Sequence, residues 1–525
     1  MAERTLLLRA DAGVAMGAGH LMRSLALAEA WQRDGGQVVL LSHCPFPDLQ
    51  RRIRRGAMRS VALDHPESDP AQLAAAVRLA LGSLLESNAA ARPWVALDGY
   101  HFDLACQQAV RETGCRLLVI DDFAHAGHYD ADLLVDQNLE ADRLEYPHVE
   151  GTTLLLGSRY VLLRSEFHAW QNWQRTVPAR ACRVLVSLGG SDPGNATARV
   201  IEALASPVAA DLEARVVVGP GNPHLPALRQ AAAATSRIEL LTEVADMAES
   251  MAWADVAVSA AGSTCWELAF MQLPALLLPI AENQRPLART LQAAGVAENL
   301  GPMRMDLPLP LGEGTRGAAT PPDIAAALSR LCDDQPRRMS YAAAGRRLID
   351  GGGADRVVAV MRAIDGSLPA AQVRLRRVAA ANSMALWRLA NEPSVRESSL
   401  STYPISLDEH EQWFQDRIDS PRIRMWVLEF QGLIVATIRY LRLDAETAEI
   451  SLAVAPAFRH RGLATRLLLE SRAQACRDLQ VRHFQAVIRE ENHFSLQTFR
   501  KAGFEHVETQ SVHGTPCHIF MREGK

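Results

Sequence analysis

The stretch LLLRADAGVAMGAGHLMRSLALAEA, Leu6–Ala30, decides the fold of the N-terminal part of this chain. It opens on three leucines, a short apolar run that is typical of a buried strand. Gly13, Gly17 and Gly19 then allow tight turns and a close approach of the backbone to another group. Apolar residues at helical spacing follow, so His20 is predicted at or just before a helix N-terminus, where free N–H groups favour an anionic ligand. The pattern indicates an imidazole beside a phosphate site; the alternative is a connecting turn in which His20 only caps the helix.

Length and composition bound the class of protein. At 525 residues, the chain is predicted to form about three domains of roughly 150 residues each. Hydrophobic residues make up 48% and charged residues 22%, which is typical of a soluble globular protein. The net charge of −5 offers no basic field for nucleic acid. No signal peptide and no apolar run near the ~20 residues that span a bilayer are found, so a cytoplasmic protein without a membrane span is expected.

The eight cysteines are scattered and form no CxxC pair, which argues against a zinc site or a disulfide framework. Reduced, mostly buried thiols are expected, and no metal is predicted. None of these features specifies an oligomeric state.

The wider stretch RADAGVAMGAGHLMRSLALA resembles the N-terminal signature of the UDP-sugar hydrolases of pseudaminic acid biosynthesis, a family related to GT-B glycosyltransferases. The residues that carry the resemblance, in order, are Arg9, Asp11, Gly17, Gly19, His20 and Arg23. The resemblance implies hydrolysis of UDP-2,4-diacetamido-2,4,6-trideoxy-β-L-altropyranose to the free sugar and UDP. His20 is expected to act as the general base toward water and Asp11 as a further catalytic residue. Gly17, Gly19 and Arg23 are expected to bind the substrate.

Strands alternate with helical stretches over the rest of the first half. The predicted elements are the strands Gln37–Ser42, Trp94–Asp98 and Leu117–Asp121 and the helix Ala71–Leu85. This alternation predicts a doubly wound parallel sheet, whose ligands gather at the carboxyl ends of the strands. Asp98 and Tyr100 lie at such an end and are predicted to contact the substrate. An acidic residue in this place is as often only a helix cap.

The following part of the chain repeats the pattern of a strand, a run of small residues and a helix. The strand Arg183–Leu188 leads into the small residues of Gly189–Asn195, and the strand Asp255–Ser259 leads into a second run of small residues. The predicted substrate contacts of this half are Ser191, Asp192, Asn195, Gly262, Ser263, Thr264, Glu267, Asn283 and Gln284. In GT-B sugar-nucleotide enzymes a glutamate in this place holds the ribose, and the resemblance assigns that role to Glu267; alternatively, Glu267 completes a capping box with Ser263 or Thr264. Two Rossmann-like halves in a GT-B-like arrangement are therefore expected.

The junction to the last part of the chain is marked by loops. Met303–Asp323 is rich in proline and glycine and is predicted to be a loop. The triple glycine of Asp350–Asp355 is predicted to be a turn before a helix that ends near Ile364, because no strand clearly precedes it. Asp365–Pro369 is the expected boundary. The predicted division is 1–175 and 176–365 for the two halves, 366–371 for a linker and 372–525 for a last domain.

The last domain has a different, α+β pattern. The predicted elements are the strand Val373–Arg376, the helices Met384–Ala390 and Leu407–Ile418, the hairpin strands Met425–Phe430 and Ile434–Leu441, and the strands Glu449–Val454 and Phe484–Ile488. The loop after Glu449–Val454 resembles the acetyl-CoA signature of GNAT acetyltransferases through Arg459, Gly462 and Ala464, and Asn492 with Ser495 resembles the second GNAT hallmark. Read alone, the loop is equally an exposed turn.

The GNAT resemblance implies acetyl-CoA as co-substrate. The residues expected to bind it are Leu452, Ala453, Val454, Arg459, His460, Arg461, Gly462, Leu463, Ala464, Thr465, Asn492 and Ser495. Many GNAT members have a tyrosine where this chain has Phe499, so the group that returns a proton to the thiolate is open, with Tyr440 or water as candidates. Glu449 is the candidate base for the incoming amine; the alternative is a strand-edge glutamate without a chemical role.

Together these patterns predict a bifunctional sugar-nucleotide enzyme. The GNAT domain is expected to acetylate the 4-amino group of UDP-4-amino-4,6-dideoxy-N-acetyl-β-L-altrosamine, which the hydrolase part would then consume. The expected partners are small-molecule UDP-sugars and acetyl-CoA. Two rival interpretations remain open, namely a glycosyltransferase that transfers the sugar to an acceptor other than water, and a binding or scaffolding role for one or both modules.

Overall fold

The computed structural model describes residues 4–13, 16–56, 58–66, 69–82, 92–242, 244, 246–302, 319–512 and 514–524. By the contacts between its residues, the chain divides into two compact units. The first unit comprises Met1–Pro147 and Leu154–Val358, and the second comprises His148–Thr153 and Ala359–Lys525. The finer division into 1–175, 176–365 and 372–525 stays a prediction.

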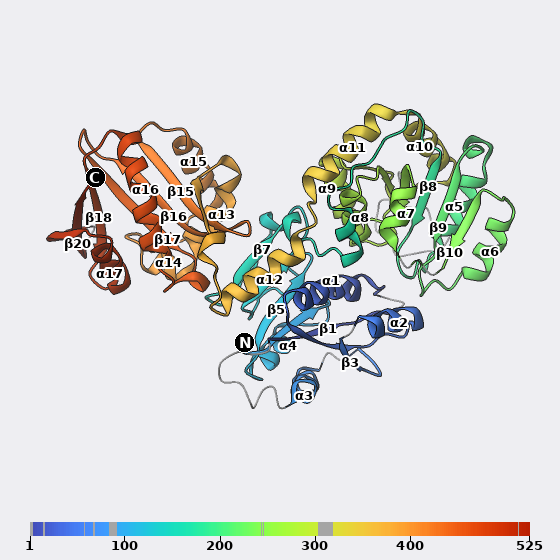
Figure 1. The fold of residues 1–525 in the computed structure, drawn as a ribbon, viewed down its shortest axis with the longest axis horizontal. Helices are drawn as coiled ribbons and strands as arrows, with labels where there is room; N and C mark the ends of the chain where they lie inside the picture. The colour runs from blue at the N-terminus through green and yellow to red at the C-terminus, as the bar shows by residue number, and fades with distance from the viewer. Residues whose placement is uncertain are drawn as a thin grey trace. The chain divides into compact units, whose positions relative to one another are not determined.

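The first sheet, drawn in blue to teal in Figure 1, has the strand order β3-β2-β1-β4-β5-β6-β7. Its strands are β1 (Thr5–Ala10), β2 (Gln37–Ser42), β3 (Arg59–Ala62), β4 (Trp94–Asp98), β5 (Arg116–Asp121), β6 (Leu133–Asp136) and β7 (Thr153–Leu156). All six residues of the central strand β1 are buried, and β1 runs parallel to both β2 and β4. The register sets Ala10 beside Asp98 and Asp121 beside Asp136, so acidic residues gather at the carboxyl edge of the sheet.

Helices pack against this sheet through their apolar residues. They are α1 (Gly19–Arg33), α2 (Pro47–Arg55), α3 (Pro70–Leu81) and α4 (Leu104–Arg111). Val77 of α3 and Val110 of α4 share one buried cluster with Leu7 of β1. Helix α1 contacts β1, β2 and β4 and buries Leu21 and Leu25. The packing fixes the start of α1, and with it His20, at the carboxyl edge.

The second sheet, drawn in green in Figure 1, has the order β10-β9-β8-β11-β12-β13. Its strands are β8 (Arg183–Ser187), β9 (Glu213–Val217), β10 (Ile238–Leu241), β11 (Val256–Ser259), β12 (Ala275–Leu277) and β13 (Ala297–Asn299). Each neighbouring pair is parallel. Its helices are α5 (Ala196–Ala205), α6 (Leu225–Ala233), α7 (Met247–Trp253), α8 (Thr264–Phe270), α9 (Gln284–Ala293), α10 (Pro321–Asp333) and α11 (Gln335–Leu348). The next helix along the chain is α12 (Gly353–Ile364), whose Asp355 pairs with Arg33 of α1. The prediction of two Rossmann-like sheets is confirmed.

The prediction of a loop over Met303–Asp323 is wrong at its C-terminal end. Residues 303–318 lie outside the described part of the chain, but α10 already begins at Pro321. The carboxylate of Asp323 accepts a hydrogen bond from the backbone N–H of Thr320 at 3.0 Å, which satisfies a free donor at the helix start. The helix predicted at Ala71–Leu85 corresponds to α3, and residues 83–85 of that prediction are not described.

The third sheet, drawn in orange to red in Figure 1, has the order β14-β15-β16-β17-β18-β20-β19. Its strands are β14 (Arg374–Arg377), β15 (Ile423–Phe430), β16 (Leu433–Arg442), β17 (Thr447–Val454), β18 (His483–Arg489), β19 (Glu505–Val512) and β20 (Thr515–Glu523). Its neighbouring pairs are antiparallel except β17 and β18, which run parallel. The helices are α13 (Ser383–Asn391), α14 (Pro393–Glu397), α15 (Leu407–Ile418), α16 (Leu463–Leu479) and α17 (His493–Lys501). The α+β prediction is confirmed.

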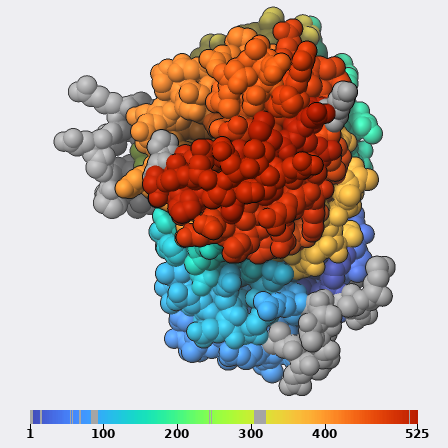
Figure 2. Space-filling view, turned by 90° about the vertical axis from the view of Figure 1, so that its left-hand side faces the viewer, coloured from blue at the N-terminus to red at the C-terminus, as the bar shows by residue number. Residues whose placement is uncertain are grey.

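The two faces of the third sheet carry different helices. Leu386 of α13 and Phe414 of α15 share a buried cluster with Met425 of β15. Helix α16 contacts β14, β15, β16 and β17, and the hydroxyl of Tyr440 in β16 lies 2.8 Å from Oγ of Ser471 in α16. Successive residues of a strand point to opposite faces. Arg439 therefore lies on the face of α13 and α15, and Tyr440 on the face of α16. The space-filling view shows the orange and red residues of this unit as one closely packed body (Figure 2).

All eight cysteines are free, and six of them are buried, as in the expectation of unpaired thiols. None of the helices within the described residues is long and apolar enough to cross a membrane.

Candidate active sites

His20 and Asp98 form a close pair at the carboxyl edge of the first sheet. His20 is the second residue of α1, and Asp98 is the last residue of β4. Nδ1 of His20 lies 2.7 Å from Oδ1 of Asp98. The Asp98 side chain is 0% exposed and that of His20 is 11% exposed. Because an ionised carboxylate can only accept, Nδ1 carries the hydrogen and Nε2 is left as an acceptor, which is the tautomer that a general base needs.

Arg23 ties Asp98 to Asp122 beneath this pair. Nε and Nη2 of Arg23 donate to the two oxygens of Asp98 at 2.8 and 2.7 Å, and Nη1 lies 2.5 Å from Oδ1 of Asp122. Burial would raise the pKa of Asp98, but Arg23 and His20 outweigh burial and hold that pKa below its usual value. In the same way Arg23 outweighs burial and lowers the pKa of Asp122 to about 2. Both carboxylates are thus ionised near neutral pH.

One further contact in this network concerns the imidazole proton. Nη2 of Arg23 lies 3.2 Å from Nδ1 of His20. Both atoms carry hydrogens in the tautomer above, so this contact is not a hydrogen bond. The shorter contact with Asp98 therefore decides the tautomer.

Tyr100 connects the buried network to the surface. Its hydroxyl donates to Oδ2 of Asp122 at 2.8 Å, and its ring meets the ring of His20 edge-on, with centroids 4.7 Å apart. Burial and the nearby Asp122 raise the pKa of Tyr100, so its hydroxyl stays protonated. Tyr100 is 40% exposed, whereas Asp98 and Arg23 lie below the imidazole. Contact of Asp98 and Arg23 with the substrate stays a prediction. In the structure their polar atoms contact each other, Asp122 and His20.

Asp11 does not join His20. Oδ1 of Asp11 lies 2.5 Å from Nη1 of Arg9 and accepts a hydrogen bond from the backbone N–H of His43 at 2.7 Å. Oδ2 of Asp11 lies 3.3 Å from Nε2 of His101. Burial would raise the pKa of Asp11, but His101 and Arg9 outweigh burial and lower it. The catalytic role of Asp11 stays a prediction, and the structure shows its carboxylate 0% exposed and paired with Arg9.

Loops of the second sheet approach the start of α1. A Cβ atom at Gly190, in the loop after β8, would lie 3.2 Å from the backbone nitrogen of Ala18. A Cβ atom at Gly19 would lie 3.5 Å from Oγ of Ser263, which directly precedes α8. Gly17 has a φ of 73°, a left-handed conformation that favours glycine. The glycines of both motifs thus let the two halves of this unit meet beside His20.

Glu267 is paired with an arginine rather than with the start of its helix. Oε1 of Glu267 lies 2.7 Å from Nη2 and 2.9 Å from Nε of Arg164. Burial raises the pKa of Glu267, and Arg164 opposes that shift. Ser263 makes no side-chain capping bond at α8, so the capping-box alternative is wrong. Glu267 is held in a fixed position beside the loop that faces Gly19.

The other predicted residues of the second half fall into two groups. The two carboxylate oxygens of Asp192 accept hydrogen bonds from the backbone N–H groups of Ala196 and Thr197 in the first turn of α5, each at 2.8 Å, and its contact with the substrate stays a prediction. Gln284 likewise accepts from the backbone of Ile280 at 3.0 Å. The residues that lie at loop surfaces, exposed or half-buried, are Ser191, Asn195, Gly262, Ser263, Thr264 and Asn283. Oδ1 of Asn195 is buried without a hydrogen-bond partner among the described residues.

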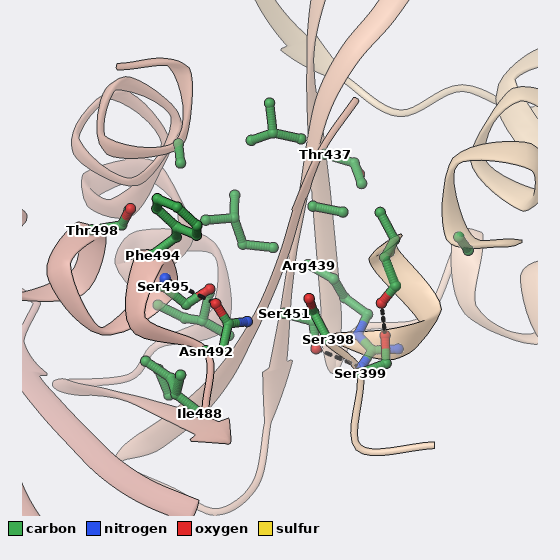
Figure 3. Close-up of a pocket in the computed structure, with 18 of the residues that line it drawn as sticks. Ser398, Ser399, Thr437, Arg439, Ser451, Ile488, Asn492, Phe494, Ser495 and Thr498 are labelled. Atoms are coloured by element: carbon green, nitrogen blue, oxygen red, sulfur yellow. Dashed lines mark hydrogen bonds between the residues drawn. The ribbon is translucent and has the colours of Figure 1, made fainter. Parts of the chain in front are cut away.

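The C-terminal unit contains a pocket of about 1090 Å³ (Figure 3). The residues predicted for acetyl-CoA that line it are Leu452, Ala453, Val454, Arg459, His460, Gly462, Leu463, Ala464, Thr465, Asn492 and Ser495, and Glu449 lines it as well. Figure 3 shows Asn492, Phe494 and Ser495 on one side of the strands, and Arg439, Ser451, Ser398 and Ser399 on the other.

The pocket arises where two parallel strands separate. β17 pairs with β18 only from Thr447–Glu449 to His483–Gln485, although β17 continues to Val454 and β18 to Arg489. Both diverging segments line the pocket, so their facing backbone groups are available to an extended ligand. Helix α16 begins directly after Gly462, whose φ is 74°, and its first N–H groups suit a pyrophosphate. These features fit a nucleotide thioester such as acetyl-CoA.

Two predictions for this pocket are wrong. Arg461 does not line it, because its guanidinium donates to the backbone carbonyls of Ala363 and Ala457. Tyr440 cannot reach the pocket, because it is 0% exposed and lies against α16. Burial raises the pKa of Tyr440, which further opposes proton release. Phe499 does line the pocket and packs on Phe504, with centroids 5.0 Å apart.

The sequence interpretation missed Arg164 and Arg439 as site residues, and it placed Asp122 at a strand end without assigning a role to it. Asp122 follows β5 directly, and its place beside a predicted strand end is a usable signal. Arg439 is a charged residue on the half-buried face of an otherwise apolar strand, which is the corresponding signal in the last domain. Within the described residues, no group of three or more metal-ligating side chains is placed to hold a metal ion.

Two segments match protein families. Residues 184–305 match the glycosyltransferase family 28 C-terminal domain, and residues 372–505 match the acetyltransferase (GNAT) domain. The chain therefore contains a segment similar to a glycosyltransferase domain and, after it, a segment similar to a GNAT acetyltransferase domain.

Individual proteins resemble parts of the chain. The spore coat polysaccharide biosynthesis protein SpsG of Bacillus subtilis (strain 168) is 31% identical over 41% of this chain and 60% of its own length. The UDP-N-acetylglucosamine--N-acetylmuramyl-(pentapeptide) pyrophosphoryl-undecaprenol N-acetylglucosamine transferase of Halorhodospira halophila is 28% identical over 60% of this chain and 95% of its own length. The solved spermidine N-acetyltransferase of Vibrio cholerae has a TM-score of 0.27 and 17% identity over 29% of this chain and 96% of that one. The chain thus spans less than two thirds of SpsG.

Proposed function

We propose that the first unit hydrolyses a UDP-sugar and that the GNAT domain acetylates an amino group of a UDP-sugar. The observation that carries the first part is the His20–Asp98 pair, with Nδ1 and Oδ1 2.7 Å apart at the start of α1. A fixed imidazole with a free Nε2, next to a helix N-terminus that favours phosphates, is suited to activating water beside a sugar diphosphate.

In the proposed hydrolysis, Nε2 of His20 accepts a proton from water while the water oxygen attacks the anomeric carbon. The bond between that carbon and the diphosphate oxygen breaks, and UDP leaves with the bonding electrons. Asp98 stabilises the imidazolium that forms, and Arg23 keeps Asp98 ionised. The N–H groups at the start of α1 stabilise the departing diphosphate. Glu267, fixed by Arg164, holds the ribose.

In the proposed acetylation, acetyl-CoA supplies the acetyl group from the pocket between β17 and β18. Glu449 lines that pocket and accepts a proton from the acceptor amine, directly or through water. Phe499 cannot return a proton to the thiolate, and Tyr440 faces the other side of the sheet. Water is therefore the proton source for the thiolate.

We assign the substrates as UDP-4-amino-4,6-dideoxy-N-acetyl-β-L-altrosamine for acetylation and UDP-2,4-diacetamido-2,4,6-trideoxy-β-L-altropyranose for hydrolysis. The motif around His20 and the fusion of both modules support this assignment, which places the protein in pseudaminic acid biosynthesis. The first reaction then makes the substrate of the second.

A glycosyltransferase is the second candidate for the first unit. The match of residues 184–305 to the glycosyltransferase family 28 C-terminal domain favours it, because that family transfers sugars to acceptors. In that case water would react poorly, and little UDP would form without an added acceptor.

Mass spectrometry of the products of the 4-amino UDP-sugar, supplied with and without acetyl-CoA, tests both steps. We expect N-acetylated UDP-sugar, free diacetamido sugar and UDP when acetyl-CoA is present. An intact acetylated UDP-sugar without UDP release would favour the glycosyltransferase. An unchanged amino sugar would contradict the proposed acceptor.

A further inference from the structure

A half-buried arginine projects into the GNAT pocket opposite the acetyl-CoA residues. Arg439 lies in β16 on the face that carries α13 and α15, and it lines the pocket. Its Nη2 donates to Oγ of Ser451 at 2.8 Å, and its guanidinium lies over the ring of Trp413, 5.4 Å from the centroid. Its Nε is buried without a hydrogen-bond partner in the described part of the chain.

The charge of Arg439 has no close counterpart. Among the described residues, no carboxylate lies within ion-pair distance of Arg439, although the charge of Glu449 acts on it and partly opposes the lowering of its pKa by burial. A cation that is withdrawn from water and lacks an ion pair is unfavourable unless a ligand supplies the opposite charge. The side chain therefore fits an anion that enters the pocket.

The other arginines on this side of the pocket are already occupied. Arg396 donates to the backbone carbonyl of Ala390 at 2.5 Å and to Oγ of Ser399 at 3.2 Å. Arg489 donates to the carbonyl of Glu397 at 2.6 Å. Both shape the segment around Ser399, which Figure 3 shows beside Arg439. Arg439 differs from these two arginines because its buried Nε has no hydrogen-bond partner among the described residues.

Arg439 and Glu449 lie on one face of neighbouring strands. Arg439 is directly opposite Ser451, and Glu449 is two residues before Ser451 in β17. Such diagonal neighbours are roughly 7–8 Å apart. An acceptor that presents its amine to Glu449 can therefore present an anionic group to Arg439, as a sugar with an amine and a phosphate on opposite sides of its ring does.

We propose that Arg439 binds a phosphate group of the acceptor, so that this GNAT domain selects amines that carry phosphate over neutral or polycationic amines. The identification of that phosphate as the diphosphate of a nucleotide sugar rests on the function proposed above. The anion-binding role of Arg439 does not.

The test is the acceptor selectivity of the full-length protein. The amino sugar is supplied as its UDP derivative, as its 1-phosphate and as the free sugar, and kcat/KM is measured for each at saturating acetyl-CoA. We expect the wild type to prefer the phosphate-bearing forms. Arg439→Ala should lower the ratio of kcat/KM for the 1-phosphate to kcat/KM for the free sugar by about 10- to 100-fold, because a hydrogen bond to a charged group is lost. Arg439→Lys, which keeps the charge, should lower that ratio less.

Arg417→Ala is the matched control. Arg417 also lies over Trp413, 5.3 Å from the centroid, but it does not line the pocket. In this variant the ratio of kcat/KM for the 1-phosphate to kcat/KM for the free sugar should stay within about twofold of the wild-type ratio. The comparison separates the loss of packing on Trp413 from the loss of the anion site. An unchanged ratio in both Arg439 variants, or an equal change in Arg417→Ala, would overturn the proposal.

Failure of the proposed function is recognised separately. If the wild type acetylates none of the amino sugars, the assigned substrate is wrong, and the same ratio is measured with phosphoethanolamine and ethanolamine. A preference for phosphoethanolamine that drops in Arg439→Ala would still support the anion site. A preference for ethanolamine or spermidine would contradict it.

Discussion

Nδ1 of His20 lies 2.7 Å from Oδ1 of Asp98, and 78 positions of sequence separate the two residues. The parallel register of β1 and β4 brings them together, because the end of β4 lies beside the start of α1. The pair gives the imidazole one defined tautomer.

Asp98→Asn should lower kcat for UDP release by about 10²- to 10⁴-fold. The asparagine can present its amide hydrogens to Nδ1, which favours the wrong tautomer of His20. Steady-state assays of UDP release measure the effect. Ser24→Ala is the control, because Ser24 donates to the same carboxylate at 3.0 Å without touching the imidazole, and less than a tenfold loss is expected. A kcat for Asp98→Asn within threefold of the wild type would refute the role of the pair.

Glu267→Gln should raise the Kd for UDP by about tenfold, since the neutral amide is a weaker acceptor for a ribose hydroxyl. Isothermal titration calorimetry on the full chain measures this affinity. Glu249→Gln is the matched control at an exposed position in the first turn of α7, and it should bind UDP as the wild type does. Equal Kd values of Glu267→Gln and Glu249→Gln for UDP would show that Glu267 only pairs with Arg164 and does not bind the nucleotide.

The free energy of unfolding should fall as the pH rises from about 4 to about 7, because Asp136 loses its proton in this range. Burial, with a contribution from the nearby Asp122, raises the pKa of Asp136 to about 7 from an ordinary value of 3.8. A carboxyl group whose pKa is raised by folding favours the folded state while it is protonated. Its contribution to the free energy of unfolding is complete below its unfolded pKa and is lost as the pH rises to its folded pKa. Asp136→Asn should flatten this part of a pH profile of the free energy of unfolding. An unchanged slope between pH 4 and 7 would contradict the assignment.

Gly462→Ala should raise KM for acetyl-CoA and destabilise the C-terminal unit by about 1–2 kcal/mol, because alanine is strained at a φ of 74°. Gly514→Ala is the control: Gly514 has a φ of 82° in the turn between β19 and β20, does not line the pocket and should lose stability without a change in KM. Acetylation kinetics and thermal unfolding distinguish the two. Equal KM values for both variants would count against a cofactor role for the loop at Gly462.

Local pattern was sufficient for most of the fold. β2 and β4 begin and end where the apolar runs predict, because buried parallel strands need continuous apolar sequence. The loop around Gly462 was also predictable, since Arg459, Gly462 and Ala464 have the spacing of the acetyl-CoA signature of GNAT acetyltransferases. Such features depend on residues that are close in sequence.

The partners of the site residues were less predictable. Asp11 directly follows the buried strand β1 and Asp98 is the last residue of the buried strand β4, yet Asp11 pairs with Arg9 and Asp98 with His20. Which carboxylate contacts the imidazole depends on the order of the strands in the sheet and on the direction in which each side chain points at the end of its strand. Likewise, the pairing of Arg164 with Glu267 spans 103 positions and has no signal in either local motif.

The most direct test of the account is single-turnover release of UDP from UDP-2,4-diacetamido-2,4,6-trideoxy-β-L-altropyranose by His20→Asn, measured beside the Kd of the variant for UDP. Removal of a general base should slow UDP release by about 10²- to 10⁴-fold. The Kd for UDP should stay within about threefold of the wild-type value, because the backbone N–H groups of α1 and the side chain of Glu267, which are proposed to bind UDP, are unchanged in this variant. Release at a rate within threefold of the wild type would contradict a catalytic role for His20 and, with it, the proposed hydrolysis.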